Sequence, residues 1–278
     1  MKAKTLILSA AILLTAVCAG CSGSNTRSGS EPKTESKEST ASSVESAPSS
    51  EESSKESVSS EEASQPAGTP VDQSWFDDAV FIGDSVTLKL SYYCEDHDDL
   101  GKAEFLCAGS LGYTNALWEL DHEDNVHPTY NGEKVTVDEG AKMLGSKKIF
   151  IMLGMNDIGL YGIDGAASSM IELTDKIAEK CPDATIYIQS VTPMVAGNSL
   201  GDLNNENIYL FDDKLKEICK EKGYQYLDVA SAVSNEDGSL IYEYCGDPPT
   251  DDNPDAMGLH FTDVGCQKWA EYLRNHVQ

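Results

Sequence analysis

The stretch AVFIGDSVTLKL, residues 79–90, passes from one kind of secondary structure to another within a single tripeptide. Its first five residues form a continuous apolar run, which is typical of a strand that is buried on both faces. After Gly83-Asp84-Ser85 the apolar residues resume, and their pattern predicts a helix over residues 86–94. The stretch therefore predicts a strand, a tight turn and a helix, with Ser85 where the helix begins.

The same alternation continues along the chain. Further strands are predicted at AEFLC (103–107), KKIFIMLG (147–154), ATIYIQSV (184–191) and YQYLDV (224–229). Helices are predicted over residues 138–144, 165–181, 205–222 and 262–276, and a hairpin within 122–137, around NGEK at 131–134. Buried strands that alternate with helices indicate a mostly parallel sheet that is covered on both faces. The predicted fold class is α/β, a three-layer α/β/α sandwich with a five-stranded, mostly parallel sheet.

The N-terminus has the pattern of an export signal. Lys2 and Lys4 precede the apolar run Leu6 to Val17, which is too short to span a membrane, so residues 1–20 are predicted to be a signal peptide. Ala19-Gly20-Cys21 resembles the end of a bacterial lipoprotein signal, in which the cysteine is lipidated. We therefore expect Cys21 to anchor the protein at the extracytoplasmic face of a bacterial membrane. Ordinary secretion after an A-x-A-like site is the alternative.

Composition divides the rest of the chain into two parts. Residues 21–74 are rich in serine and contain no aromatic residue, so they are predicted to form a disordered tether. Residues 75–278 have aromatic residues and regular apolar periodicity without an internal repeat, which predicts one folded domain. The net charge of −27 makes nucleic acid a poor candidate partner. We expect a monomer.

Six cysteines fall in the predicted domain, at positions 94, 107, 181, 219, 245 and 266. An even number in an exported chain permits up to three disulfides. Most of these cysteines lie in strand or helix patterns, as small apolar residues would, so we expect mostly free, buried thiols. No CxxC motif or Cys/His cluster suggests zinc, and no cofactor is predicted.

Ligands of open parallel sheets bind beyond the carboxyl ends of the strands, so the residues there are candidates for chemistry. Ser85 follows the first strand, where the exposed N–H groups of a helix start favour a nucleophilic hydroxyl. On this tripeptide alone, a role as helix cap, for Ser85 or Asp84, is the favoured interpretation. After the second strand, AGSLGYTN (108–115) has glycines at 109 and 112, which permit a tight turn with a backbone N–H directed into the cleft.

Two further segments complete the set of candidates. Gly154-Met155-Asn156-Asp157 follows the third strand, where Asn156 could donate its amide N–H groups to an oxyanion while Asp157 stabilises the turn. His260, in AMGLHFTD, stands immediately before the last helix, whereas the other histidines lie in polar loops or near the C-terminus. A serine early in a domain and a general base late in it is a known order, because triads are defined by geometry.

These segments together resemble the GDSL, or SGNH, hydrolase family of serine esterases and lipases. FIGDSVT, SLGYTN, GMND and GLHFTDVGCQKWA resemble its four sequence blocks, in the family's order and over nearly the whole domain. The resemblance implies a flavodoxin-like SGNH hydrolase fold, with Ser85 as nucleophile and His260 as general base. It also implies an oxyanion hole formed by the backbone N–H groups of Ser85 and Gly112 and by the side chain of Asn156.

One position departs from the family pattern. The family's acid normally lies three residues before the histidine, and Met257 occupies that position here. Asp255 is the nearest carboxylate and is assigned as the acid. A Ser-His dyad, with His260 oriented by a backbone carbonyl, is the alternative. Asp263 is a third option, but it would point elsewhere from the first turn of the last helix.

The cluster of Asp247, Asp251, Asp252 and Asp255 invites a calcium-site interpretation. Its spacing does not match the EF-hand loop, so we expect a solvated acidic loop and no metal.

The resemblance implies an exported serine esterase that hydrolyses or transfers small acyl groups, foremost O-acetyl groups on carbohydrate. Its partner would be a small acyl ester or an acylated glycan. Two alternatives stay open: a lysophospholipase or short-chain lipase, and a non-catalytic, glycan-binding surface lipoprotein on the same scaffold.

Overall fold

The computed structural model describes residues 69–277. The predicted signal peptide, the lipidated Cys21 and nearly all of the predicted tether lie outside the described residues. Within them, the chain makes domain contacts ahead of Trp75. The 3₁₀ helix η1 spans Gln73–Phe76, and the N–H of Val71 donates to the carbonyl of Arg274 at 2.8 Å.

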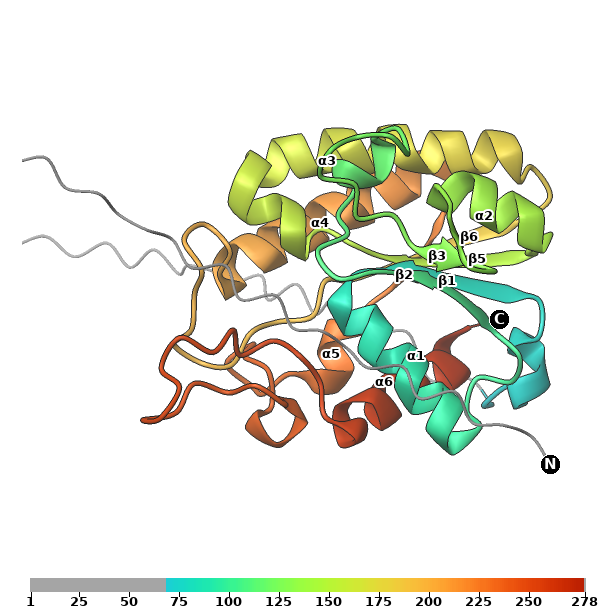
Figure 1. The fold of residues 1–278 in the computed structure, drawn as a ribbon. Coiled ribbons are helices and arrows are strands. Elements are labelled where there is room, and N and C mark those ends of the chain that lie inside the picture. The colour runs from blue at the N-terminus through green and yellow to red at the C-terminus, as the bar shows by residue number, and fades with distance from the viewer. Residues whose placement is uncertain (1–68, 278) are drawn as a thin grey trace, which may run out of the picture. The chain divides into compact units, whose positions relative to one another are not determined.

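A parallel sheet forms the centre of the fold (Figure 1), and this sheet has five strands. Its neighbouring strands pair in parallel and stand in the order β2-β1-β5-β6-β7. The strands span Ala79–Gly83 (β1), Glu104–Cys107 (β2), Lys148–Met152 (β5), Thr185–Gln189 (β6) and Gln225–Leu227 (β7). The predicted fold class is confirmed, with a sheet that is wholly parallel.

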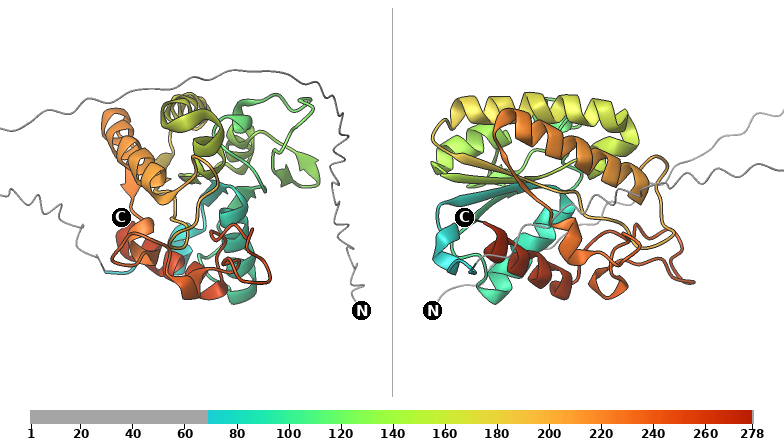
Figure 2. Two further views of the ribbon diagram at one scale, coloured as in Figure 1. Left: turned by 90° about the vertical axis from the view of Figure 1, so that its left-hand side faces the viewer. Right: turned by 180° about the vertical axis from the view of Figure 1, so that it is seen from behind.

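Helices cover both faces of the sheet (Figures 1 and 2). One face carries α2 (Val137–Leu144), α3 (Met155–Lys180) and α4 (Asn205–Lys222), and the other carries α1 (Ser85–His97), α5 (Ala230–Val233) and α6 (Asp263–His276). Along the sheet, the rings of Phe81 and Phe150 stack with centroids 4.6 Å apart, and Phe150 stacks on Tyr187 at 4.5 Å. Burial of these rings explains why the strands read as continuous apolar runs.

Helix α3 begins ten residues earlier than the sequence predicts. It starts at Met155, directly after the third strand of the chain's sheet, and is interrupted at Gly162, where φ is 68° and ψ is 175°. Glycines at 159, 162 and 165 weaken the helical pattern of this segment, because glycine has a low helix propensity. The early start places Asn156 and Asp157 on the first turn of a helix.

The predicted hairpin is present but shorter than expected. Strands β3 (Thr129–Tyr130) and β4 (Glu133–Lys134) pair antiparallel around Asn131 and Gly132. Both turn residues have positive φ, 50° and 86°, as a type I′ turn requires. Strand β4 ends at Lys134, although the N–H of Val135 still donates to the carbonyl of Pro128 at 3.0 Å, and α2 begins at Val137.

Helices α1 and α6 lie against each other, although they come from opposite ends of the domain. Lys89 on α1 pairs with Asp263 on α6, and Arg274 on α6 pairs with Asp99, just beyond α1. These contacts hold together the two helices that begin next to Ser85 and His260.

All six cysteines of residues 69–277 are free, five of them buried and Cys107 partly buried, as the sequence predicts. Burial raises the pKa of the thiols of Cys107, Cys219 and Cys266 to about 12. Within the same residues, none of the helices combines the length and the apolar character that a membrane crossing needs.

Candidate active site

Ser85 stands at the junction of β1 and α1, at the carboxyl edge of the sheet. Asp84 is the N-cap of α1, and its Oδ1 accepts the N–H of Val86 at 2.9 Å. The neighbouring Gly83 leaves no room for a side chain, since an added Cβ would lie 1.9 Å from Oγ1 of Thr87. Because Asp84 caps the helix, the hydroxyl of Ser85 is left for another partner.

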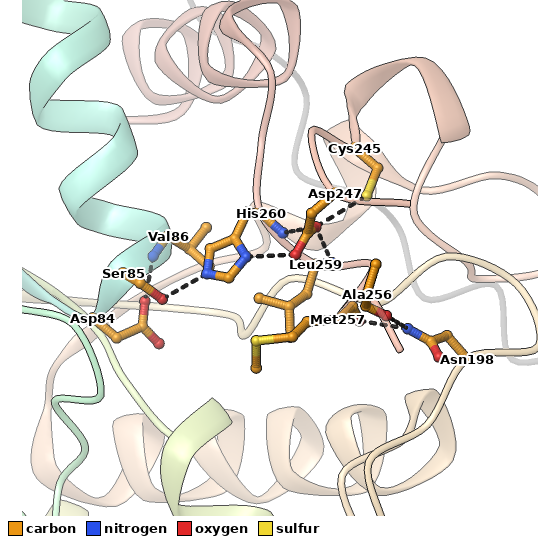
Figure 3. A network of polar contacts seen from close by, with 10 residues as sticks. All are labelled: Asp84, Ser85, Val86, Asn198, Cys245, Asp247, Ala256, Met257, Leu259 and His260. Atoms are coloured by element: carbon orange, nitrogen blue, oxygen red, sulfur yellow. Dashed lines mark hydrogen bonds and ion pairs between the residues drawn. The ribbon is translucent and has the colours of Figure 1, made fainter. Parts of the chain in front are cut away.

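That partner is His260, which lies before α6 and its N-cap Thr262. The Nε2 of His260 is 3.0 Å from Oγ of Ser85, and its Nδ1 is 2.7 Å from Oδ2 of Asp247 (Figure 3). The carboxylate can only accept, so we assign the proton to Nδ1 and leave Nε2 to accept from the Ser85 hydroxyl. The three side chains form a continuous serine–histidine–aspartate chain.

Asp247 is fixed by several donors besides the imidazole. Its Oδ1 accepts the backbone N–H groups of Leu259 and His260, at 3.0 and 2.9 Å, and lies 3.4 Å from Sγ of Cys245. Partial burial alone would raise the pKa of Asp247, but its hydrogen bonds with His260 outweigh that and lower it. The carboxylate is therefore ionised at neutral pH and held toward Nδ1.

The prediction that Asp255 lies against His260 is wrong. Asp255 is exposed on the loop of residues 248–257, and Asp247 occupies the place beside the imidazole. The cause is a short antiparallel return of the chain, in which Cys245 pairs with Phe261 and the N–H of Gly246 donates to the carbonyl of His260 at 2.7 Å. The intervening loop, which carries Asp255, is left outside this pairing.

The other two options for orienting His260 were Asp263 and a backbone carbonyl, and neither has that role in the structure. Asp263 lies on α6 and pairs with Lys89, so it does not face the imidazole. A backbone carbonyl is not needed to orient His260, because a carboxylate already contacts Nδ1. In the sequence, Asp247 stands out only as part of the acidic cluster. The signal that could have identified it is the pair of β-prone segments, 242–245 and 259–261, that flank the proline-rich loop.

The acidic loop itself stays solvated. Asp251, Asp252 and Asp255 are exposed. Across residues 69–277, histidine, cysteine, aspartate and glutamate side chains form no group of three or more that could hold a metal ion.

The two predicted oxyanion-hole residues reach the same edge of the sheet, but their donors are not aligned. Nδ2 of Asn156 is 3.0 Å from the carbonyl of Leu111 and 3.5 Å from Oδ2 of Asp84, next to Ser85. The N–H of Gly112 donates to Oδ1 of Asn115 at 2.8 Å. In a trans peptide the carbonyl and the N–H point in opposite directions. The N–H of Gly112 is therefore directed away from the amide of Asn156.

Asp157 secures the loop that carries Gly112. Its side chain is 1% exposed and accepts the N–H groups of Tyr113 and Thr114, each at 2.8 Å. A Cβ on Gly112 would lie 2.5 Å from Oδ2 of Asp157, so only glycine fits there. Sequence reasoning assigned Asp157 to its own turn. The structure shows that it binds the neighbouring loop instead.

Burial also governs the ionisation of Asp84. Its side chain is 1% exposed, and this desolvation raises the pKa of its carboxyl to about 6, although hydrogen bonds from the N–H groups of Val86 and Thr87 act in the opposite direction. A group that titrates near pH 6 thus lies directly beneath Ser85.

Residues 81–268 match the sequence model of the GDSL-like Lipase/Acylhydrolase family. A comparison with the sequences of curated proteins gave no match.

Several solved structures have a similar fold. One, described as a platelet activating factor of Streptococcus pneumoniae, has a TM-score of 0.52 at 17% identity and covers 73% of this chain and 90% of its own. A protein described as an acylhydrolase of Bacteroides fragilis has a TM-score of 0.51 at 15% identity, and the match covers 70% of this chain and 84% of that chain. A GDSL-like lipase of Bacteroides thetaiotaomicron has a TM-score of 0.50 at 15% identity, and the match covers 74% of this chain and 89% of that chain. At these identities the likeness extends to the fold alone.

Proposed function

Because this chain belongs to the GDSL-like lipase/acylhydrolase family, we propose that it is an extracytoplasmic serine esterase that hydrolyses or transfers small acyl groups, foremost O-acetyl groups on carbohydrate. The observation that carries the catalytic part is the chain of contacts from Ser85 through His260 to Asp247. A hydroxyl next to an imidazole whose other nitrogen faces a carboxylate is the arrangement that activates serine as a nucleophile.

In the first step, Oγ of Ser85 attacks the carbonyl carbon of the ester and forms a C–O bond. The hydroxyl proton passes to Nε2 of His260, and the electron pair of the carbonyl π bond moves to its oxygen. Asp247 stabilises the imidazolium that results, without taking up the proton. The oxyanion would form near the N–H of Ser85 and the side chain of Asn156, whose Nδ2 donates to the carbonyl of Leu111 in the substrate-free protein.

In the second step, the intermediate collapses. The carbonyl reforms, the bond to the alcohol oxygen breaks, and His260 returns its proton to that oxygen, which leaves Ser85 acylated. Water then attacks the acyl-enzyme with His260 as base, and the acid leaves while the hydroxyl of Ser85 is restored. If a second alcohol replaces water, the same steps transfer the acyl group.

The openness of the site supports a small, soluble acyl donor. The side chain of His260 is 32% exposed, and Ser85 is partly buried, so an ester reaches the hydroxyl directly from solvent. Met257 extends from its loop toward the side on which Ser85 and Asp84 lie (Figure 3) and is 39% exposed. Met257 offers a small apolar contact, which suits an acetyl group.

A hollow beside the same loop supports a carbohydrate as the acyl carrier. It has a volume of about 370 Å³ and is lined by Asn198, Asn235 and Tyr242, together with Pro249 and Pro254. Tyr242 is 59% exposed, so its ring face is accessible for stacking. The amide NH₂ groups of Asn198 and Asn235 donate within the protein, and their amide oxygens can accept hydrogen bonds from hydroxyl groups. The predicted lipid anchor at Cys21 would bring this site close to the glycans of a cell wall. We expect the protein to act as a monomer.

The catalytic proposal is tested by acetate release from acetylated xylan, from peptidoglycan and from aryl acetates, with Ser85→Ala as control. We expect turnover by the wild-type protein, none by the variant, and covalent labelling of Ser85 by a fluorophosphonate. The proposal is wrong if the protein neither hydrolyses aryl acetates nor is labelled at Ser85.

The same assay separates the two alternatives. A lysophospholipase or short-chain lipase would show activity that rises with acyl length from acetate to octanoate. A glycan-binding protein without catalysis would bind acetylated oligosaccharides equally well with and without Ser85→Ala and would release no acetate. The lipid anchor is tested separately, by incorporation of radioactive palmitate into the wild-type chain and into Cys21→Ala.

A further inference from the structure

One peptide group in the candidate site has the wrong orientation for its expected role. The carbonyl of Leu111 accepts from Nδ2 of Asn156 at 3.0 Å, so this carbonyl oxygen takes a hydrogen bond that the oxyanion of a substrate would need. On the other side of the same peptide, the N–H of Gly112 donates to Oδ1 of Asn115 at 2.8 Å. The Leu111–Gly112 peptide thus occupies the Asn156 donor with its carbonyl, and its N–H points away from the oxyanion hole.

The residues on both sides of this peptide are held independently of it. On the N-terminal side, the N–H of Leu111 donates to the carbonyl of Ala108 at 3.2 Å, and the side chain of Leu111 is fully buried. On the C-terminal side, the carbonyl of Gly112 accepts the N–H of Ala116 at 3.0 Å, and Asp157 holds the next two N–H groups. The peptide between them can therefore rotate while the rest of the loop keeps its place.

Gly112 makes such a rotation sterically feasible. A half-turn of the peptide changes the φ of residue 112 by about 180° with little displacement of its Cα. The φ of Gly112 now lies outside the left-handed region, so the rotation would bring it to positive values, which glycine adopts without penalty. After the rotation, the N–H of Gly112 faces Asn156 and the carbonyl of Leu111 faces away.

We infer that Asn115 is a positioning residue that holds the Leu111–Gly112 peptide out of the oxyanion hole at rest, and that the developing oxyanion of the substrate rotates it into place. Asn115 is suited to this because its Nδ2 also donates to the carbonyl of Ser110 at 2.8 Å, which fixes the direction of its Oδ1. The inference rests on the proposed esterase activity and adds the residue that sets how readily the hole forms.

The inference predicts opposite effects for two substitutions at one position. Asn115→Ala removes the acceptor for the N–H of Gly112, so the hole should form more readily, by about fivefold if one ordinary hydrogen bond is lost. Asn115→Asp loses the donor to the carbonyl of Ser110, as Asn115→Ala does, but it keeps an acceptor for the N–H of Gly112 and gives it a charge, so the resting orientation should be favoured by about the same factor. A residue that only maintained the loop would give losses in both variants.

The probe is phenylboronic acid, which forms a tetrahedral adduct with the Ser85 hydroxyl and places an oxygen in the hole. Its inhibition constant and the kcat for an aryl acetate should both improve about fivefold in Asn115→Ala and worsen about fivefold in Asn115→Asp. KM should stay within twofold of wild type, because the ground-state ester does not need the hole.

Ser169→Ala serves as the matched control, because Oγ of Ser169 accepts from the hydroxyl of Thr114 in the same loop at 2.9 Å without contact to the rotating peptide. It should leave the inhibition constant unchanged. If Asn115→Ala does not fold, Asn115→Ser, whose hydroxyl is too short to reach Gly112, replaces it. Changes of equal sign in the alanine (or serine) and aspartate variants, or no change, overturn the inference. Absence of any Ser85-dependent turnover by the wild-type protein would instead refute the proposed function.

Discussion

Asp247 lies 2.7 Å from Nδ1 of His260, across thirteen residues of sequence, whereas the position three residues before the histidine holds Met257. The backbone N–H of His260 donates to the same carboxylate, so the aspartate contacts both the main chain and the side chain of its partner. The acid of this triad thus lies just before the loop of residues 248–257, and the histidine lies just after it.

Asp247→Asn should therefore lower kcat for an aryl acetate by a factor on the order of 10³ to 10⁴, because an amide can present its NH₂ group to the imidazole and favour the wrong tautomer. Asp255→Asn is the matched control and should retain full activity, since its side chain is exposed on the loop. The comparison is made by steady-state kinetics at pH 8. Equal losses in the two variants would contradict this assignment of the acid.

The buried carboxyl of Asp84 should make the stability of the domain depend on pH. In the unfolded chain Asp84 ionises near its ordinary pKa of 3.8, whereas burial raises its pKa to about 6 in the folded protein. Between these values only the unfolded chain has lost the proton, so the free energy of unfolding falls as pH rises from about 4 to 6 and then levels off. The difference corresponds to about 3 kcal/mol.

Asp84→Asn keeps the oxygen that caps α1 but does not titrate, so its free energy of unfolding should fall less over this pH range than that of wild type. Urea denaturation at pH 4, 5, 6 and 7 measures the difference. Burial also raises the pKa values of Asp157 and Asp212, and these groups are common to both proteins. Parallel pH curves for the two proteins would show that Asp84 is not the group responsible.

Asp157→Asn should destabilise the domain by about 1 to 3 kcal/mol, because the two carboxylate oxygens accept two N–H groups and an amide has only one acceptor. Asp164→Asn is a suitable control on the same helix, since its side chain is 90% exposed and pairs with Lys214 at the surface. Urea denaturation of the control should match that of wild type. Similar midpoints for all three proteins would mean that Asp157 does not anchor the loop.

The free thiols predict that reducing agents leave the domain unchanged. Thermal unfolding of the protein should have the same midpoint with and without dithiothreitol, because no disulfide links residues 69–277. Iodoacetamide should label Cys107, Cys219 and Cys266 slowly in the native state, since burial raises the pKa of each to about 12, and rapidly after unfolding in urea. A midpoint lowered by several degrees on reduction would indicate a disulfide.

The sheet was predictable because its central strands β1, β5 and β6 are almost wholly buried, so their segments are largely apolar. The run AVFIG coincides with β1, and the other four runs contain their strands with a few extra residues. The start of α3 was not predictable in the same way. Its first turns carry glycines and a polar pair, and they are helical because Met155 and Ile158 pack into the core.

Residues that act through local sequence were identified more readily than those placed by long-range pairing. Ser85, His260 and Asn156 follow strands or precede a helix, and the structure brings each to the same edge. Asp247 reaches the imidazole through hydrogen bonds between residues 244–247 and 258–262, which leave little trace in a single sequence. The rotation of the Leu111–Gly112 peptide depends on one side chain, Asn115. The hydrophobic periodicity of the sequence gives no indication of this role.

The separation of Ser85 and His260 has a consequence in time. The two residues that meet at 3.0 Å are 175 positions apart, so a ribosome adding roughly 5–20 residues per second makes the histidine on the order of ten to thirty seconds after the serine. Throughout that interval the nascent chain displays an ordinary, unreactive hydroxyl. The proposed nucleophile therefore depends on the docking of α6 against α1, which brings His260 to Ser85.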